Sequence, residues 1–112
     1  MILVIGGSGF IGSAVVRRLI GRGERVAVAT TRPEHARALF DGLGVEVRSA
    51  DVRDNASLAR AMAGCGRVVI SVQFPGFPVE SPARGRTFRA IDTEGTRRAV
   101  AAASRGGVER VV

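Results

Sequence analysis

The chain has 112 residues, of which 46% are hydrophobic, and a formal net charge of +7. This length predicts one domain with one core, the apolar content excludes intrinsic disorder, and no segment approaches the roughly 20 apolar residues of a membrane span. All 17 basic residues are arginines spread along the chain, without tyrosine or tryptophan to stack on bases, so we expect neither membrane nor nucleic-acid binding.

The first part of the chain alternates short apolar segments with helical ones. Ile2–Ile5 is continuously apolar, which predicts a strand buried on both faces. Phe10–Gly21 predicts a helix, and the residues expected to line its buried face are Ile11, Ala14, Val15, Arg18 and Leu19. Arg25–Thr30 predicts a second strand, and Pro33–Phe40 a short helix with proline at an early position that needs no N–H donor.

The same alternation continues through the second part. Further strands are predicted at Val45–Ala50, Arg67–Val72 and Val108–Val112. A third helix is expected from a cap at Asp54 or Asn55 to about Ala63. Thr87–Ser104 predicts a long helix, in which Gly95 permits close approach to a sheet and the buried stripe comprises Ile91, Gly95, Arg98, Ala99 and Ala102.

Regular strand–helix alternation requires parallel strands joined by right-handed crossovers. The expected fold over residues 1–112 is therefore α/β: a doubly wound Rossmann sheet of strand order 3-2-1-4-5, with helices on both faces in three layers.

A glycine-rich segment joins the first strand to the first helix. Gly6, Gly9 and Gly12 are spaced as a turn that binds a dinucleotide pyrophosphate requires: the first permits the tight turn, the second lets phosphate approach the backbone, and the third lets the helix pack closely. The free amides and dipole of the helix N-terminus favour the anion. The residues expected to contact the cofactor here are Gly6, Gly7, Ser8, Gly9, Phe10, Ile11 and Gly12.

The end of the second strand indicates which nucleotide is preferred. An acidic residue about 20 positions past the glycines binds the ribose hydroxyls of NAD. This chain has Thr30-Thr31-Arg32 there, and a guanidinium can bind a 2′-phosphate through two hydrogen bonds. We therefore expect NADP(H) to be preferred, with NAD(H) possible. The alternative is that Arg32 is one more solvated arginine.

Asp51 and Val52 follow the third strand at the same predicted edge of the sheet. A carboxylate there can accept from the adenine amino group while valine packs on the ring; the alternative is that Asp51 caps a helix. The loop Phe74-Pro75-Gly76-Phe77-Pro78 either walls a substrate pocket or only connects two elements. The single cysteine, Cys65, fits a reducing cytoplasm and is a poor candidate nucleophile. No metal site is predicted.

These motifs together resemble the short-chain dehydrogenase/reductase superfamily, especially its extended and atypical branches, the NAD-dependent epimerase/dehydratase and NmrA-like groups. The resemblance rests on the glycine turn, on Arg32, on Asp51-Val52, on the helical stretch Ile91–Val100 and on the ending Gly107–Val112. It implies that Ser71 and Val72, after strand four, border the nicotinamide ribose. Two departures are Ser71-Val72-Gln73 in place of an Asn-Ala-Ala/Gly segment, and Asp92 where many extended members have asparagine.

The catalytic pair of this superfamily, Tyr-x-x-x-Lys, is missing, because the chain contains no tyrosine and no lysine. In relatives the pair follows strand five, and a bare strand ending at Val112 would expose an apolar edge. We therefore expect the chain to be the N-terminal part of a longer protein that also binds a small-molecule substrate.

Three functions remain open from the sequence, because one fold serves many functions. The first is the NADP(H)-binding domain of an oxidoreductase or epimerase/dehydratase-like enzyme. The second is an NmrA-like sensor that binds the nicotinamide cofactor without turnover. The third is an interaction or nucleic-acid protein that uses the +7 charge.

Overall fold

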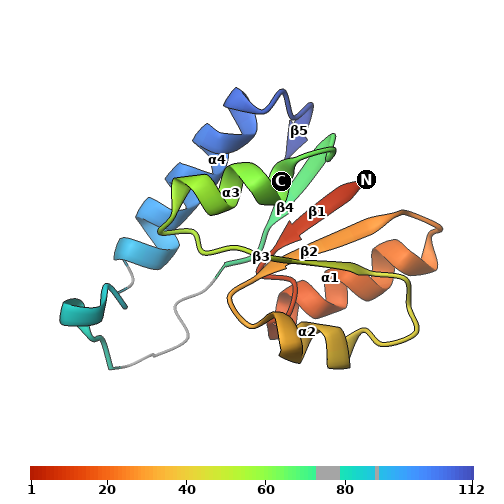
Figure 1. Ribbon diagram of the computed structural model, residues 1–112, viewed down its shortest axis with the longest axis horizontal. Coiled ribbons are helices and arrows are strands. Elements are labelled where there is room, and N and C mark those ends of the chain that lie inside the picture. The colour runs from red at the N-terminus through yellow and green to blue at the C-terminus, as the bar shows by residue number, and fades with distance from the viewer. Residues whose placement is uncertain (73–78, 88) are drawn as a thin grey trace.

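The computed structural model describes residues 1–72, 79–87 and 89–112. Five parallel strands form one sheet in the order β3-β2-β1-β4-β5. The strands are β1 (Ile2–Ile5), β2 (Val26–Thr30), β3 (Glu46–Ser49), β4 (Arg67–Ile70) and β5 (Arg110–Val111). The helices are α1 (Phe10–Gly21), α2 (Pro33–Leu39), α3 (Asn55–Met62) and α4 (Glu94–Arg105). Figure 1 shows α1 and α2 on one face of the sheet and α3 and α4 on the other, which confirms the predicted doubly wound fold.

The central strands are buried on both faces, as their continuous apolar character predicts. Alternate residues of β1 enter two different clusters. Leu3 packs in the larger cluster, which includes residues of α3 and α4. Val4 packs in the smaller cluster, with Val16 of α1 and Phe40 after α2. The two clusters hold the helices on both sides of the sheet, and so fix the position of the strand ends.

The carboxyl ends of the strands meet at one edge of the sheet. Ile5 is paired with Ala29 on β2 and with Ile70 on β4. Backbone hydrogen bonds continue beyond the strands, from Ser71 N to the Ile5 carbonyl at 2.8 Å and from Ala50 N to the Thr30 carbonyl at 3.0 Å. The segments after β1, β2, β3 and β4 therefore leave the sheet together, which is where an open α/β sheet places its ligands.

The buried face of α1 differs from the predicted one. Gly12 and Val16 are its buried residues, whereas Ile11, Ala14 and Arg18 are exposed. Val15 and Leu19 are partly buried, as expected at the border of that face. The prediction was wrong because it treated Ile11 as a core residue, although the start of α1 stands at the open edge of the sheet and not over it.

The predicted helix Thr87–Ser104 is not α-helical throughout. A π-helical turn, η2 (Arg89–Thr93), precedes α4, and residue 88 lies outside the described residues. The spacing of the apolar residues did not reveal the π-helical turn, because a π-helix and an α-helix can both bury one face. The stripe is otherwise confirmed, with Ile91, Gly95, Ala99 and Ala102 buried, while Arg98 is only partly buried. Strand β5 is shorter than predicted.

The connection between β4 and α4 is described only in part. The predicted loop Phe74–Pro78 lies outside the described residues. Residues 81–86 form a compact turn that contains a short 3-10 helix, η1 (Pro82–Arg84), and an antiparallel bridge between Ser81 and Arg86. Among the described residues, no helix is long and apolar enough to span a bilayer.

Candidate functional site

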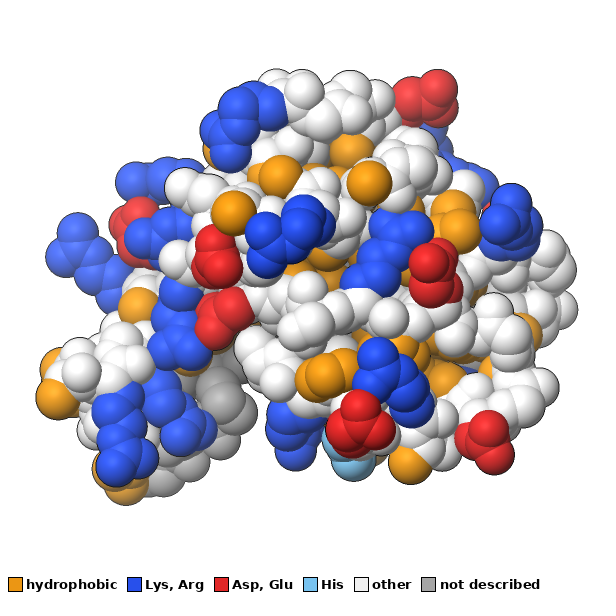
Figure 2. All heavy atoms as spheres, viewed as in Figure 1, with side chains coloured by type: hydrophobic (Ala, Val, Ile, Leu, Met, Phe, Trp, Pro, Cys, Tyr) orange, Lys and Arg blue, Asp and Glu red, His pale blue; other side chains and the backbone are white. Residues whose placement is uncertain are grey.

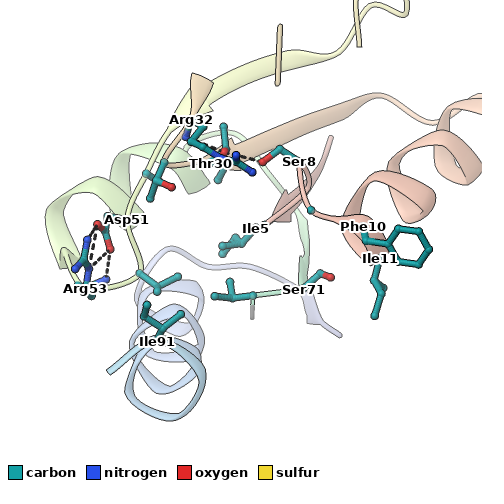
Figure 3. A pocket seen from close by; sticks show the side chains of 18 of the residues that line it. Ile5, Ser8, Phe10, Ile11, Thr30, Arg32, Asp51, Arg53, Ser71 and Ile91 are labelled. Atoms are coloured by element: carbon teal, nitrogen blue, oxygen red, sulfur yellow. Dashed lines mark hydrogen bonds and ion pairs between the residues drawn. The ribbon is translucent and has the colours of Figure 1, made fainter. Parts of the chain in front are cut away.

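A cavity of about 820 Å³ opens at the carboxyl edge of the sheet. Its volume is within the usual range for small-molecule and cofactor sites. Of the residues predicted to contact the cofactor, all except Gly7 line this cavity: Gly6, Ser8, Gly9, Phe10, Ile11, Gly12, Arg32, Asp51, Val52, Ser71 and Val72. Figure 3 shows Phe10 and Ile11 at one end of the cavity and Asp51 and Arg53 at the other.

Two glycines make the turn after β1 possible. Gly6 has a φ of +80°, and a Cβ there would lie 2.4 Å from the carbonyl oxygen of Ser71. A Cβ on Gly12 would lie 2.2 Å from the carbonyl oxygen of Gly6. A side chain at Gly6 or Gly12 would therefore collide with the protein backbone, whether or not a ligand is bound. Gly7 is buried beneath the turn, where a Cβ would meet the Val28 side chain at 2.9 Å, so it does not face the cavity.

Gly9 has a different environment from these three glycines. It lines the cavity, its φ is −78°, and a Cβ at this position would have the Gly6 oxygen as its nearest neighbour at 3.4 Å, an ordinary contact. The protein fold thus accepts a side chain at Gly9. Because Gly9 lines the cavity at the start of α1, we expect a side chain there to take up space that an approaching phosphate requires.

The start of α1 is left open toward the cavity. Its N-cap, Gly9, provides no side chain, and the first turn contains no acidic residue. Helix α3 offers the contrast, since Asp54 accepts hydrogen bonds there from Ala56 N at 3.0 Å and Ser57 N at 3.3 Å. The uncapped amides and dipole of α1 can therefore bind an anion, and the cradle fits the pyrophosphate of a dinucleotide.

A short hydrogen-bonded chain connects this turn to the end of β2. The hydroxyls of Ser8 and Thr30 lie 2.9 Å apart, and Arg32 N donates to Thr30 Oγ1 at 3.0 Å. The hydroxyl of Ser8, one of the residues expected to contact the cofactor, is thus bonded to Thr30. Within the described parts of the chain, the Arg32 guanidinium has no ion-pair partner.

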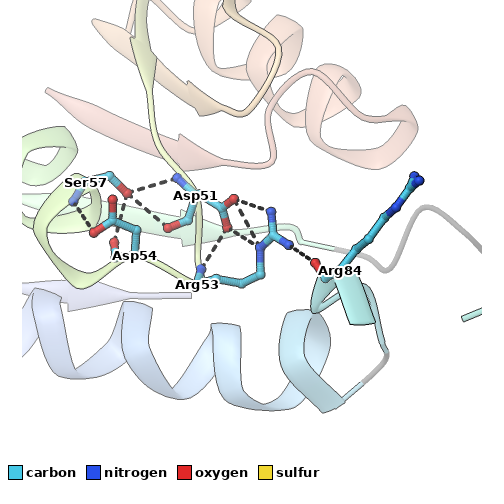
Figure 4. A network of polar contacts seen from close by, with 5 residues as sticks. All are labelled: Asp51, Arg53, Asp54, Ser57 and Arg84. Carbon is cyan, nitrogen blue, oxygen red and sulfur yellow. Dashed lines mark hydrogen bonds and ion pairs between the residues drawn. The ribbon is translucent and has the colours of Figure 1, made fainter. Parts of the chain in front are cut away.

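The carboxylate of Asp51 is bound by Arg53, a residue that the sequence analysis did not identify (Figure 4). Arg53 Nε donates to Oδ1 at 2.9 Å, Nη2 donates to Oδ2 at 2.6 Å, and the Arg53 backbone N donates to Oδ1 at 2.9 Å. The hydrogen bond from the Arg53 side chain lowers the pKa of Asp51 below its ordinary value, against a smaller opposing effect of burial. An adenine amino group would therefore share oxygens that Arg53 already occupies.

The remaining lining residues complete the walls. The side chain of Asp51 does not cap α3, because Asp54 does so. Val52 is buried against α4, where a Cβ on Gly95 would lie 2.6 Å from Val52 Cγ2. Gly95 thus lets α4 approach the Val52 side chain closely, and not the sheet itself. Arg86 also lines the cavity and was not identified from the sequence, because it follows a proline-rich segment without a recognisable motif.

Comparison with known proteins supports the same interpretation. A family model described as NAD(P)H-binding matches residues 6–112. The chain is 36% identical over 110 residues to sterol demethylase protein B of Methylococcus capsulatus, covering 98% of this chain and 32% of that protein. It is 36% identical over 119 residues to cinnamoyl-CoA reductase 1 of Oryza sativa subsp. japonica, covering 100% of this chain and 33% of that protein.

A solved structure gives a similar result. A short-chain dehydrogenase/reductase superfamily protein from Agrobacterium tumefaciens, with bound NAD, superposes with a TM-score of 0.77 at 34% identity, covering 99% of this chain and 31% of that one. The chain spans about a third of the length of the curated relatives that it matches. Together with the parallel sheet and the glycine turn, these matches show that the chain belongs to the NAD(P)H-binding family and is a Rossmann domain of the extended short-chain dehydrogenase/reductase superfamily.

Proposed function

We propose that this domain prefers NADP(H) and belongs to an oxidoreductase or epimerase/dehydratase-like enzyme. The observation that carries the preference is the charge of the cavity. Its charged lining residues are Arg32, Arg53, Arg86 and Asp51, which leave an excess of two positive charges. A 2′-phosphate adds negative charge to the adenosine half of the cofactor, and an arginine binds phosphate more effectively than an acidic residue would.

The residues of this chain have distinct roles in the proposed complex. The uncapped amides at the start of α1 bind the pyrophosphate, and Gly9 gives it room. Arg32 binds the 2′-phosphate, with its backbone held by the Thr30 hydroxyl. Val52 and the carboxylate of Asp51 border the adenine, and Ser71 and Val72 border the nicotinamide ribose. When bound, the nicotinamide supplies hydride transfer, and this domain orients it.

The proton-transfer and substrate-binding groups are proposed to lie in further sequence. The chain has no tyrosine or lysine, so the superfamily's catalytic pair is not within it. It also covers only about a third of the relatives reported above, one of which is named as a reductase. The buried single thiol of Cys65 fits a reducing compartment, and we propose a cytoplasmic protein.

A second candidate is a cofactor sensor without turnover, because the contacts described above all serve to bind the cofactor. The two candidates differ in one measurement on the protein with all of its sequence. An oxidoreductase oxidises bound NADPH in the presence of a carbonyl substrate, and an epimerase/dehydratase-like enzyme converts its substrate while regenerating the cofactor, whereas a sensor binds NADPH and converts no substrate.

The cofactor preference is tested by titrating NADPH and NADH into the wild type and Arg32→Asp. We expect the wild type to bind NADPH at least about tenfold more tightly, equal to about 1.4 kcal/mol, and the variant to reverse that order. Arg22→Asp is the matched control, because Arg22 is an exposed arginine at the other end of α1. Equal affinities for both cofactors in the wild type and in Arg32→Asp would remove Arg32 from the site.

A further inference from the structure

The compact turn of residues 81–86 is attached to the cofactor cavity by Arg53. Arg53 Nη1 donates to the backbone carbonyl of Arg84 at 2.9 Å (Figure 4). A Cβ on Gly85 would lie 3.5 Å from the same Nη1 atom, so the backbone of the turn rests directly on the guanidinium. Because Asp51 fixes that guanidinium from its other side, the turn has a defined position relative to the end of β3.

The backbone of the turn is also fixed internally. Ser81 N donates to the Arg86 carbonyl at 2.9 Å, and Arg86 N donates to the Ser81 carbonyl at 3.1 Å. Gly85 between them has a φ of +66°. The hydrogen bonds that shape the turn use backbone atoms, so the side chain of Arg86 is left available. Arg86 lines the cavity, whereas the side chain of Arg84 points away from the polar network in Figure 4.

This attachment places Arg86 at the adenosine end of the cavity. Asp51 and Arg53 lie at the end opposite Phe10 and Ile11, which mark the start of α1 and the pyrophosphate cradle. Arg53 is neutralised by Asp51, but neither Arg86 nor Arg32 has an ion-pair partner among the described residues. Figure 2 shows arginine side chains gathered over the part of the molecule where the 81–86 turn and the start of α4 lie.

Adenine and its ribose are uncharged, so a further phosphate on this half of the nucleotide would give the guanidinium groups of Arg32 and Arg86 an anionic partner. We propose that Arg86 is a second specificity-determining residue for the 2′-phosphate of NADP(H), positioned across the cavity from β2 by the hydrogen bond between Arg53 and the 81–86 turn. The proposal rests on the proposed function, and it adds a residue from the β4–α4 connection to the expected contact from Arg32.

The test uses two probes that differ only in the group of interest: adenosine 2′,5′-bisphosphate and adenosine 5′-monophosphate. Their affinities are measured by calorimetry at about 0.15 M salt, where charges farther apart than about 8 Å are screened. We expect Arg86→Met to bind the bisphosphate at least roughly fivefold more weakly than the wild type does, because one charge-assisted contact is lost. Its affinity for the monophosphate should be unchanged. Arg86→Lys retains the charge and is expected to recover part of the loss.

Arg84→Met is the matched control, because it removes the same charge from the same turn and preserves the carbonyl that Arg53 binds. We expect it to bind both probes as the wild type does. If Arg86→Met behaves like Arg84→Met while the wild type still prefers the bisphosphate, the role of Arg86 is overturned and the proposed NADP(H) preference stands. If the wild type binds both probes equally, the proposed preference itself fails, and the role of Arg86 with it.

Discussion

The hydroxyls of Ser8 and Thr30 lie 2.9 Å apart and join the phosphate turn to the end of β2. Thr30 also accepts a hydrogen bond from Arg32 N at 3.0 Å, although its side chain is only 5% exposed. One buried hydroxyl thus connects the element expected to bind the pyrophosphate with the residue expected to bind the 2′-phosphate. These hydrogen bonds therefore hold the two halves of the proposed cofactor site next to each other.

This connection predicts the effect of Thr30→Val, which keeps the side-chain shape and removes the hydroxyl. We expect a loss of about 1–2 kcal/mol in the free energy of unfolding, because the Arg32 amide loses its partner in a partly buried position. The preference for NADPH over NADH should decrease as well. Chemical denaturation and cofactor titration measure the two effects. Thr31→Val, at the exposed neighbouring position, is the control for stability, and an equal loss in both variants would contradict the account.

The ion pair between Asp51 and Arg53 predicts a pH dependence of stability. The Arg53 side chain lowers the pKa of Asp51 in the folded protein, so the pair stabilises the fold at pH values above the ordinary aspartate pKa of about 4. This contribution is lost as the pH falls through the lowered pKa. Both side chains are partly exposed, so solvent screening keeps the effect below about 1 kcal/mol.

The measurement compares the wild type with Arg53→Gln in denaturation experiments from pH 7 to pH 2. We expect the variant to be less stable at neutral pH and the difference to narrow in acid, when Asp51 takes up its proton in both proteins. Arg60→Gln, at an exposed position on α3, should show a difference that does not depend on pH in this range. A constant difference for Arg53→Gln would mean that Asp51 does not contribute through its charge.

The sequence was sufficient to predict the sheet order and the place of the cavity. The continuously apolar strands and the first glycine turn can each be recognised from a short stretch of sequence. Parallel strands of any length bring their carboxyl ends to one edge of the sheet. The buried side of α1 was mistaken at Ile11, because hydrophobicity alone does not show that a helix begins beyond the edge of a sheet.

Long-range contacts explain what the sequence analysis missed at the site. Arg53 meets Arg84 across 31 positions, and Ser8 meets Thr30 across 22, so neither contact has a local pattern. Arg86 lines the cavity from the turn that Arg53 contacts, so its place there also depends on a long-range contact. Gly7 does not line the cavity, and spacing alone does not distinguish a glycine that faces a ligand from one that packs on Val28.

The central claim is that the turn in front of α1 binds the pyrophosphate of the cofactor, and Gly9→Ala tests it most directly. The backbone at Gly9 accepts alanine, and its Cβ would meet protein only at 3.4 Å, so we expect the unfolding free energy to change by less than about 1 kcal/mol. Gly21→Ala, in open space at the end of α1, is the control.

The affinity for NADPH decides the outcome. We predict that Gly9→Ala folds like the wild type and binds NADPH at least about tenfold more weakly, a loss of about 1.4 kcal/mol, while Gly21→Ala binds it normally. A folded Gly9→Ala protein with wild-type affinity for NADPH would contradict the account, because the cradle would then be filled without any effect on the cofactor.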